Sequence, residues 1–174
     1  AMSPGAGFAE TARYQQIDPQ TVPSYERLLW GVYDVPDYTD NLLNLPVIAY
    51  SGENDKQIQA ARVMEEAFTS AGRTLDHRIG PGMGHAYHPE TLKKLLGDLK
   101  EFRDRGLDRS PSRVMLQTRT LRYHKLHWVD IRRLDKHWQD TRVDAQQDSA
   151  GHIRLTTKNV ACLRLSPDNL PAEV

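Results

Sequence analysis

Cysteine is almost absent from this sequence. Cys162 is the only cysteine among 174 residues, so no disulfide can form within the chain and a cysteine-rich metal site is excluded. The residues around Cys162 alternate between apolar and polar, as in a half-buried β-strand. In that context we expect Cys162 to be a small buried hydrophobic side chain and not a nucleophile.

The sequence also lacks an excess of charge and any long hydrophobic run. Lysine and arginine together number 23, as do aspartate and glutamate, so no net positive charge attracts nucleic acid or an anionic membrane. No apolar run approaches the roughly 20 residues of a membrane-spanning helix. We therefore expect neither a nucleic-acid partner nor a membrane partner. No secretory signal is visible, and the sequence leaves the cellular compartment open.

Two predicted strands are each followed by a side chain that is common in catalytic sites. Residues 47–50 form an apolar, β-rich run typical of a buried parallel strand, and Asp55 follows it after a Ser-Gly turn. Residues 75–79 predict a second strand, and a glycine-rich loop then leads to His85, 30 residues after the aspartate. This separation is about one strand–helix–strand crossover. Because the carboxyl ends of parallel strands meet at one sheet edge, we expect the two side chains to lie close together.

An aspartate and a histidine at such an edge are two of the three groups of a Ser–His–Asp triad, in the chain order of α/β-hydrolases. The segments PVIAYSGENDKQIQAARVMEEAF and IGPGMGHAYHP resemble the C-terminal end of a prolyl-oligopeptidase-like α/β-hydrolase. The segment SPGAGF at residues 3–8 is similar to the one that leaves the strand after the nucleophile helix in such enzymes. The resemblance implies that Asp55 is the triad acid, that His85 is the general base, and that the substrate is a peptide or an ester.

The nucleophile of such a triad is missing. The sequence contains no Gly-x-Ser-x-Gly motif, which would place a serine on a sharp turn between a strand and a helix, and we expect this elbow to precede residue 1. Ser3 and Ser51 lie near the expected site, but neither stands in such a context, so we expect neither to be a nucleophile. One oxyanion-hole donor is the amide after the nucleophile and is lost with it. The chain is therefore predicted to be inactive unless a nucleophile is supplied.

Both candidate residues have a structural alternative. Asp55 precedes an amphipathic helix and can be its N-cap, a role that is compatible with that of a triad acid. His85 can be a solvated loop histidine. His88 and Glu90 follow at a spacing that occurs in metal sites, but no third ligand is specified and Pro89 marks the start of a helix. We therefore expect no metal and no cofactor.

Helical periodicity and turn residues predict the other elements of the first part of the chain. The expected helices cover residues 25–33, 34–43, 56–70 and 89–102. Asp34 is the expected cap of the second helix, and Gly72 and Gly106 are the expected ends of the last two. Together with the two strands, these helices predict an α/β fold, namely a partial α/β-hydrolase in which helices flank parallel strands.

A polar break with proline and serine at residues 107–112 is the expected linker between a domain at residues 1–106 and a β-rich extension at residues 113–174. Beyond the break the apolar pattern changes from helical to alternating. The expected strands cover residues 114–120, 123–130, 142–145, 152–157 and 160–165, which is typical of a small antiparallel sheet or sandwich. The aromatic and histidine side chains at residues 123–138 fit either ligand binding or sheet packing, of which packing is the more common role.

Two classes of function are compatible with these features. The chain is either the acid–histidine half of a serine hydrolase, inactive alone, or a non-catalytic binding module in which a reused hydrolase scaffold and the β extension hold a partner. A hydrolase sheet that begins near residue 47 has one unpaired strand edge, and exposed edges pair with other chains. We therefore expect a homo-oligomer, most simply a two-fold dimer that buries this edge.

Overall fold

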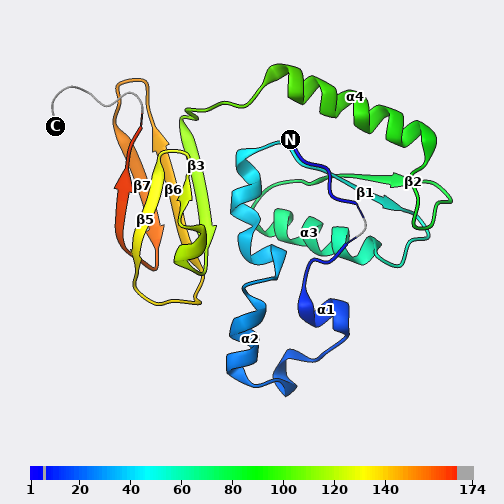
Figure 1. Cartoon of the computed structure of the whole chain (residues 1–174), viewed down its shortest axis with the longest axis horizontal. Coiled ribbons are helices and arrows are strands. Elements are labelled where there is room, and N and C mark those ends of the chain that lie inside the picture. Colours follow the sequence, from blue (N-terminus) through cyan, green and yellow to red (C-terminus); the bar gives the residue numbers. More distant parts are fainter. Residues whose placement is uncertain (6, 168–174) are drawn as a thin grey trace. The chain divides into compact units, whose positions relative to one another are not determined.

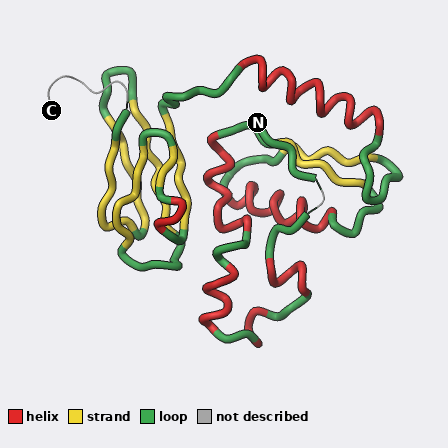
Figure 2. Tube along the Cα trace, in the orientation of Figure 1, coloured by secondary structure: helices red, strands yellow, loops and turns green. Residues whose placement is uncertain are grey.

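The computed structural model describes residues 1–5 and 7–167, which belong to two compact units (Figure 1). The first unit comprises residues 1–107 and combines helices with a pair of parallel strands. The second unit begins at residue 108 and consists mainly of antiparallel strands (Figure 2). The expected mixed α/β class, with a small antiparallel part after the parallel strands, is confirmed at this level.

The first unit is built around the two parallel strands. Its elements, with η for a 3-10 helix, are α1 (Thr11–Gln15), η1 (Pro19–Thr21), α2 (Ser24–Trp30), η2 (Val35–Asn44), β1 (Ile48–Gly52), α3 (Ile58–Ser70), β2 (Asp76–Gly80) and α4 (Pro89–Arg105). The strands β1 and β2 pair in parallel from Ile48 opposite Asp76 to Gly52 opposite Gly80. The predicted parallel strand–helix–strand unit is therefore confirmed.

Helices cover both faces of this strand pair, with α3 on one side and α4 on the other (Figure 1). On β1, Ala49 packs with Phe68 of α3, whereas Ile48 and Tyr50 pack with Leu95 of α4. All of β1 is buried, as a strand covered on both faces must be. This packing fixes the ends of the strands relative to the two helices.

Glycine ends both long helices, as predicted. At the end of α3, Gly72 has φ 71°; its N–H donates to the carbonyl of Thr69, and the N–H of Arg73 donates to the carbonyl of Phe68. These two bonds form a Schellman motif, which satisfies carbonyls that the helix leaves unpaired. The helix α4 ends at Gly106, which has φ 79°.

Asp34 occupies the N-cap position of η2, as expected, but its side chain makes no hydrogen bond to that helix. Its Oδ1 accepts hydrogen bonds from the backbone N–H of Thr11 at 2.9 Å and from the hydroxyl of Thr11 at 2.6 Å. The carboxylate thus satisfies the start of α1, where the N-cap residue Glu10 makes no side-chain hydrogen bond to the helix. The bond crosses 23 residues of sequence, so no local pattern could indicate it.

The edge of β1 is not bare, which also differs from the prediction. The N–H of Met2 donates to the carbonyl of Pro46 at 3.0 Å. The N–H groups of Ile48 and Tyr50 donate to the carbonyls of Met2 and Pro4 at 3.1 and 3.0 Å, in a parallel arrangement. Because successive residues of an extended chain direct their backbone groups to opposite sides, Ser3, between Met2 and Pro4, is the residue whose backbone groups face away from β1. Residues 2–4 therefore lie along the edge of β1.

The second unit is a sandwich of two three-stranded antiparallel sheets. Its elements are β3 (Arg113–Thr118), η3 (Leu121–Tyr123), β4 (Lys125–Leu126), β5 (Val129–Leu134), β6 (Thr141–Gln147), β7 (Ile153–Lys158) and β8 (Val160–Leu165). The strand orders are β3-β6-β7 and β4-β5-β8. The strand expected at residues 123–130 is wrong in its bounds, because η3, β4 and the start of β5 share this segment.

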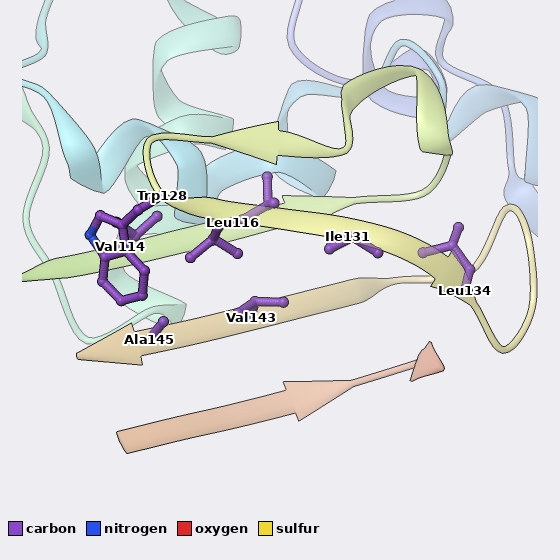
Figure 3. Packing of buried hydrophobic residues seen from close by; sticks show 8 residues of the cluster. Val114, Leu116, Trp128, Ile131, Leu134, Val143 and Ala145 are labelled. Carbon is purple, nitrogen blue, oxygen red and sulfur yellow. The ribbon is translucent and has the colours of Figure 1, made fainter. Parts of the chain in front are cut away.

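One apolar core fills the sandwich. Figure 3 shows side chains of β3 and β6 meeting those of Trp128 and β5, and this core consists of Val114, Leu116, Trp128, Val129, Ile131, Leu134, Val143 and Ala145. Trp128 is 6% exposed, and its indole N–H donates to the carbonyl of Pro111 at 2.8 Å. For this tryptophan, packing is thus the observed role, whereas Tyr123 and Trp138 are exposed.

Cys162 is exposed, so the expectation of a buried cysteine is wrong. On β8, Leu165 packs against the core of the sandwich, and Cys162 stands opposite Arg133 of β5 in the register. Alternation along β8 therefore places the cysteine on the outer face.

The chain passes from one sheet to the other at Asn159, between β7 and β8. Asn159 has φ 59°, in the left-handed region that asparagine tolerates better than most residues. Its amide group donates to the carbonyl of Lys136 and to the hydroxyl of Thr141, and its Oδ1 accepts from the N–H of Lys136. These bonds hold the corner between the two sheets.

Asp140 joins three strands of the sandwich by charged hydrogen bonds. Its carboxylate accepts from Lys158 of β7 at 2.8 Å, from Gln117 of β3 at 2.9 Å and from Arg142 of β6 at 3.0 Å. Burial by itself raises the pKa of Asp140, but these hydrogen bonds and the charge of Arg142 outweigh it, so the pKa is lowered. The ionised carboxylate therefore stabilises the folded state.

The pH dependence of unfolding tests this contribution. A carboxyl whose pKa is lower in the folded state contributes stability above its unfolded pKa of about 3.9, and loses it as pH falls through the folded pKa. We expect Asp140→Asn to lower the free energy of unfolding by about 1 to 3 kcal/mol at neutral pH and to weaken its decline in acid. Urea denaturation at a series of pH values measures both. The control Asp135→Asn changes an exposed aspartate; equal losses in the two variants would contradict the prediction.

Candidate functional site

Asp55 lies in the turn that leads from β1 to α3 and is 8% exposed. Its Oδ1 accepts a hydrogen bond from the N–H of Gln57 at 2.9 Å, and its backbone carbonyl accepts one from the N–H of Ile58 at 3.1 Å. Its Oδ2 lies 3.1 Å from Nδ1 of His85. The two carboxylate oxygens thus have different partners, so Asp55 supports the start of a helix and contacts the histidine at the same time.

His85 lies in the loop between β2 and α4, and its imidazole is 71% exposed. With its proton on Nδ1, the ring donates to the buried carboxylate of Asp55, and this geometry leaves the lone pair on Nε2. That nitrogen is the one that accepts a proton from a nucleophile in a Ser–His–Asp triad. The structure therefore brings the two predicted residues together, with Nδ1 of the ring facing the carboxylate.

A cavity of about 250 Å³ lies beside the pair. It is lined by Gly5, Tyr50, Ser51, Gly52, Asp55, His85, Ala86 and Tyr87. These residues come from the C-terminal half of β1, the turn after it, the loop after β2 and the N-terminal segment. Open α/β sheets bind their ligands at this edge, so the cavity is the candidate site of the first unit.

Backbone hydrogen bonds join the turn after β1 to the loop after β2. The N–H of Glu53 donates to the carbonyl of Gly80 at 3.0 Å, and the N–H of Asn54 donates to the carbonyl of Met83 at 2.8 Å. A Cβ atom on Gly52 would overlap the carbonyls of Met83 and Gly84. Glycine at position 52 thus allows the histidine loop to approach the end of β1.

A hydrogen-bonded group of a serine, a histidine and a carboxylate, the Ser51–His77–Glu65 group, lies between the strands and α3. His77 contacts Ser51 Oγ through Nε2 at 3.0 Å and Glu65 Oε1 through Nδ1 at 3.0 Å. Burial raises the pKa of Glu65, but hydrogen bonds from Arg62 and His77 outweigh it and leave the pKa below its usual range. The sequence analysis identified neither His77 nor Glu65, although a polar residue opposite the buried Ala49 is a signal for such a contact.

The burial of Ser51 and His77 indicates that the Ser51–His77–Glu65 group has a structural role. The side chain of His77 and the whole of Ser51 are each 1% exposed. Although Ser51 is one of the residues that line the cavity, its hydroxyl contacts His77 and is closed to solvent. Ser51 therefore has the partners of a nucleophile without the access of one. The Ser51–His77–Glu65 group instead joins β1, β2 and α3 next to the site.

Removing the imidazole of His77 should destabilise the first unit. We expect His77→Ala to lower the free energy of unfolding by about 2 to 4 kcal/mol, because it leaves a cavity and deprives the buried Ser51 hydroxyl of its partner. Chemical denaturation provides the measurement. His152→Ala is the matched control, since His152 forms an exposed contact with Asp148 at 3.1 Å. If His77→Ala lowers the free energy of unfolding no more than this control does, the buried histidine contributes little.

His88 occupies the N-cap of α4, and its Nδ1 accepts a hydrogen bond from the N–H of Thr91 at 3.4 Å. This contact accounts for one of the two residues whose spacing suggested a metal site. Within residues 1–5 and 7–167, the structure contains no group of three or more His, Cys, Asp or Glu side chains that could hold a metal ion.

Comparison with known proteins adds no relative. No protein-family model, no curated protein and no solved structure matches the chain. The resemblance to prolyl-oligopeptidase-like hydrolases therefore depends on the sequence motifs alone. Across the described part of the chain, no helix has the length and apolar character needed to cross a membrane.

Proposed function

We propose that the first unit carries the acid and the histidine of a prolyl-oligopeptidase-like serine hydrolase and that another polypeptide segment supplies the nucleophile. The observation that carries this proposal is the contact of 3.1 Å between Asp55 Oδ2 and His85 Nδ1 at the C-terminal edge of two parallel strands. The cavity beside this contact provides a place for the reacting group. The sequence resemblance supplies the reaction class, which is hydrolysis of a peptide or an ester.

In this mechanism the two residues have separate tasks. His85 accepts the proton of the incoming serine hydroxyl on Nε2 and then donates it to the leaving group. Asp55 keeps the proton of the neutral ring on Nδ1 and stabilises the imidazolium that forms. Burial of the carboxylate strengthens this interaction, whereas the exposure of the imidazole leaves room for the segment that brings the serine.

The chain alone should not react with a serine-hydrolase probe. The hydroxyl of Ser51 is buried and bonded to His77, and the sequence lacks the elbow that provides both the nucleophile and one oxyanion donor. We expect no stoichiometric labelling by a fluorophosphonate, measured by intact mass. Labelling that disappears in His85→Ala would contradict this prediction. Slow hydrolysis of an activated aryl ester would not, because a free imidazole catalyses that reaction unaided.

Supplying the missing segment tests the proposal directly. A segment that carries the Gly-x-Ser-x-Gly motif of a hydrolase of this group, coexpressed with this chain, should restore labelling on its serine. Asp55→Asn should then lower the rate by about 10⁴-fold, because the histidine adopts the wrong tautomer. Restored labelling that survives both Asp55→Asn and His85→Ala would contradict the assigned roles.

We also propose that two copies of the chain associate through the edge formed by residues 2–4. The backbone groups of Ser3 face away from β1 and can pair with a second strand. Leu28 and Leu29 of α2 are 46% and 53% exposed and add apolar surface in the same unit. A two-fold axis would pair the two edges with each other.

Proline at the edge tests this association. Ser3→Pro removes the N–H that points outward, so we expect it to convert a dimer into a monomer in light scattering. Ser3→Ala keeps the N–H and should leave the dimer intact. A wild-type monomer at all concentrations would contradict the proposal.

The sandwich favours a second candidate function, that of a binding module. The strand β7 is an outer strand of its sheet, and five of its six residues are exposed. Such a strand can accept a further strand from a partner. An association that resists Ser3→Pro but is lost in Thr157→Pro, which removes an N–H of β7 that points away from β6, would support this candidate over the first.

A further inference from the structure

We infer that Tyr50 is the residue that positions His85, an inference that rests on the proposed role of His85 as general base. Tyr50 lies on β1 and is 4% exposed. Its hydroxyl donates to the carbonyl of Ala86 at 3.0 Å and accepts a hydrogen bond from the N–H of His88 at 2.8 Å. One oxygen atom therefore holds the backbone on both sides of Tyr87, starting directly after His85.

The ring that carries this hydroxyl is itself fixed. It packs with Ile48 and Leu95 in the core on the α4 side of the strands, and its centroid lies 4.4 Å from that of Tyr87. A Cβ on Gly80 would overlap the hydroxyl of Tyr50, so glycine at the end of β2 leaves the space that the hydroxyl occupies. The packing of its ring thus fixes the position of the Tyr50 hydroxyl that contacts the histidine loop.

The same strand consequently fixes both members of the candidate pair. Asp55 follows β1 in the chain, and Tyr50 holds the loop of His85 from within β1. The backbone bonds from Glu53 and Asn54 hold Gly80 and Met83, which precede His85. The contact with Asp55 adds little after that point, because the imidazole is 71% exposed and solvent weakens such contacts. Without the hydroxyl of Tyr50, the imidazole should leave the carboxylate.

The tautomer of His85 reports this positioning without any need for enzymatic activity. In wild type, the contact with Asp55 should keep the proton of the neutral ring on Nδ1, whereas a solvated histidine prefers it on Nε2. We expect Tyr50→Phe to shift the ¹⁵N resonances of the imidazole towards those of a solvated ring. We also expect hydrogen exchange of the His88 amide to become about tenfold faster, because the variant removes one hydrogen bond.

Two further variants make the test specific. Tyr38→Phe removes a hydroxyl that donates to the carbonyl of Gly31 at 3.0 Å in the same unit, and it should leave the His85 tautomer unchanged. Gly80→Ala keeps the hydroxyl of Tyr50 but forces it out of its place, and it should produce the same tautomer shift as Tyr50→Phe. Gly80→Ala decides the outcome if Tyr50→Phe fails to fold.

The possible results separate this inference from the proposed function. If wild type has its proton on Nδ1 and folded Tyr50→Phe keeps it there, the positioning role of Tyr50 is overturned and the Asp55–His85 pair stands. If wild type already shows the resonances of a solvated ring, the pair itself is overturned. A shift in Tyr50→Phe and Gly80→Ala, but not in Tyr38→Phe, supports the inference.

Discussion

Parallel pairing between β1 and β2 is the constraint on which the candidate site depends. A parallel ladder places the carboxyl ends of both strands at one edge, so the residues that follow each strand meet there although they are far apart in sequence. The ladder ends with Gly52 opposite Gly80, and Asp55 and His85 come directly after this point. The helices α3 and α4 bury the two faces of the pair and prevent the strands from shifting.

One serine–histidine–carboxylate group is observed near this edge and another is proposed there. The two differ in whether a substrate can reach them. Ser51, His77 and Glu65 have the contacts of a complete triad, yet the serine and the imidazole are buried and closed to a substrate. Asp55 and His85 lack a serine in this chain, yet the histidine is open to solvent. Bond lengths alone therefore do not identify a catalytic site, because a nucleophile must also meet its substrate.

The sequence predicted the features that local patterns determine. The parallel strands, the glycine ends of α3 and α4 and the proximity of Asp55 and His85 follow from periodicity, turn residues and strand order. Contacts between distant segments were missed, since no local pattern encodes them; the bond from Asp34 to Thr11 and the pairing of Met2 with the strand segment near β1 are examples. Cys162 was misplaced because alternation shows that neighbouring residues face opposite sides but not which side is inner.

The strand order of the sandwich has a consequence for how the protein is made. In the sheet β4-β5-β8 the main partner of β5 is β8, which the ribosome synthesises after β6 and β7. Until Leu165 has left the exit tunnel, the apolar side chains of β5 lack the strand that completes their sheet. The strands β1 and β2 of the first unit are synthesised well before that point and can pair while synthesis continues. The apolar side chains of the sandwich therefore stay uncovered for longer during translation.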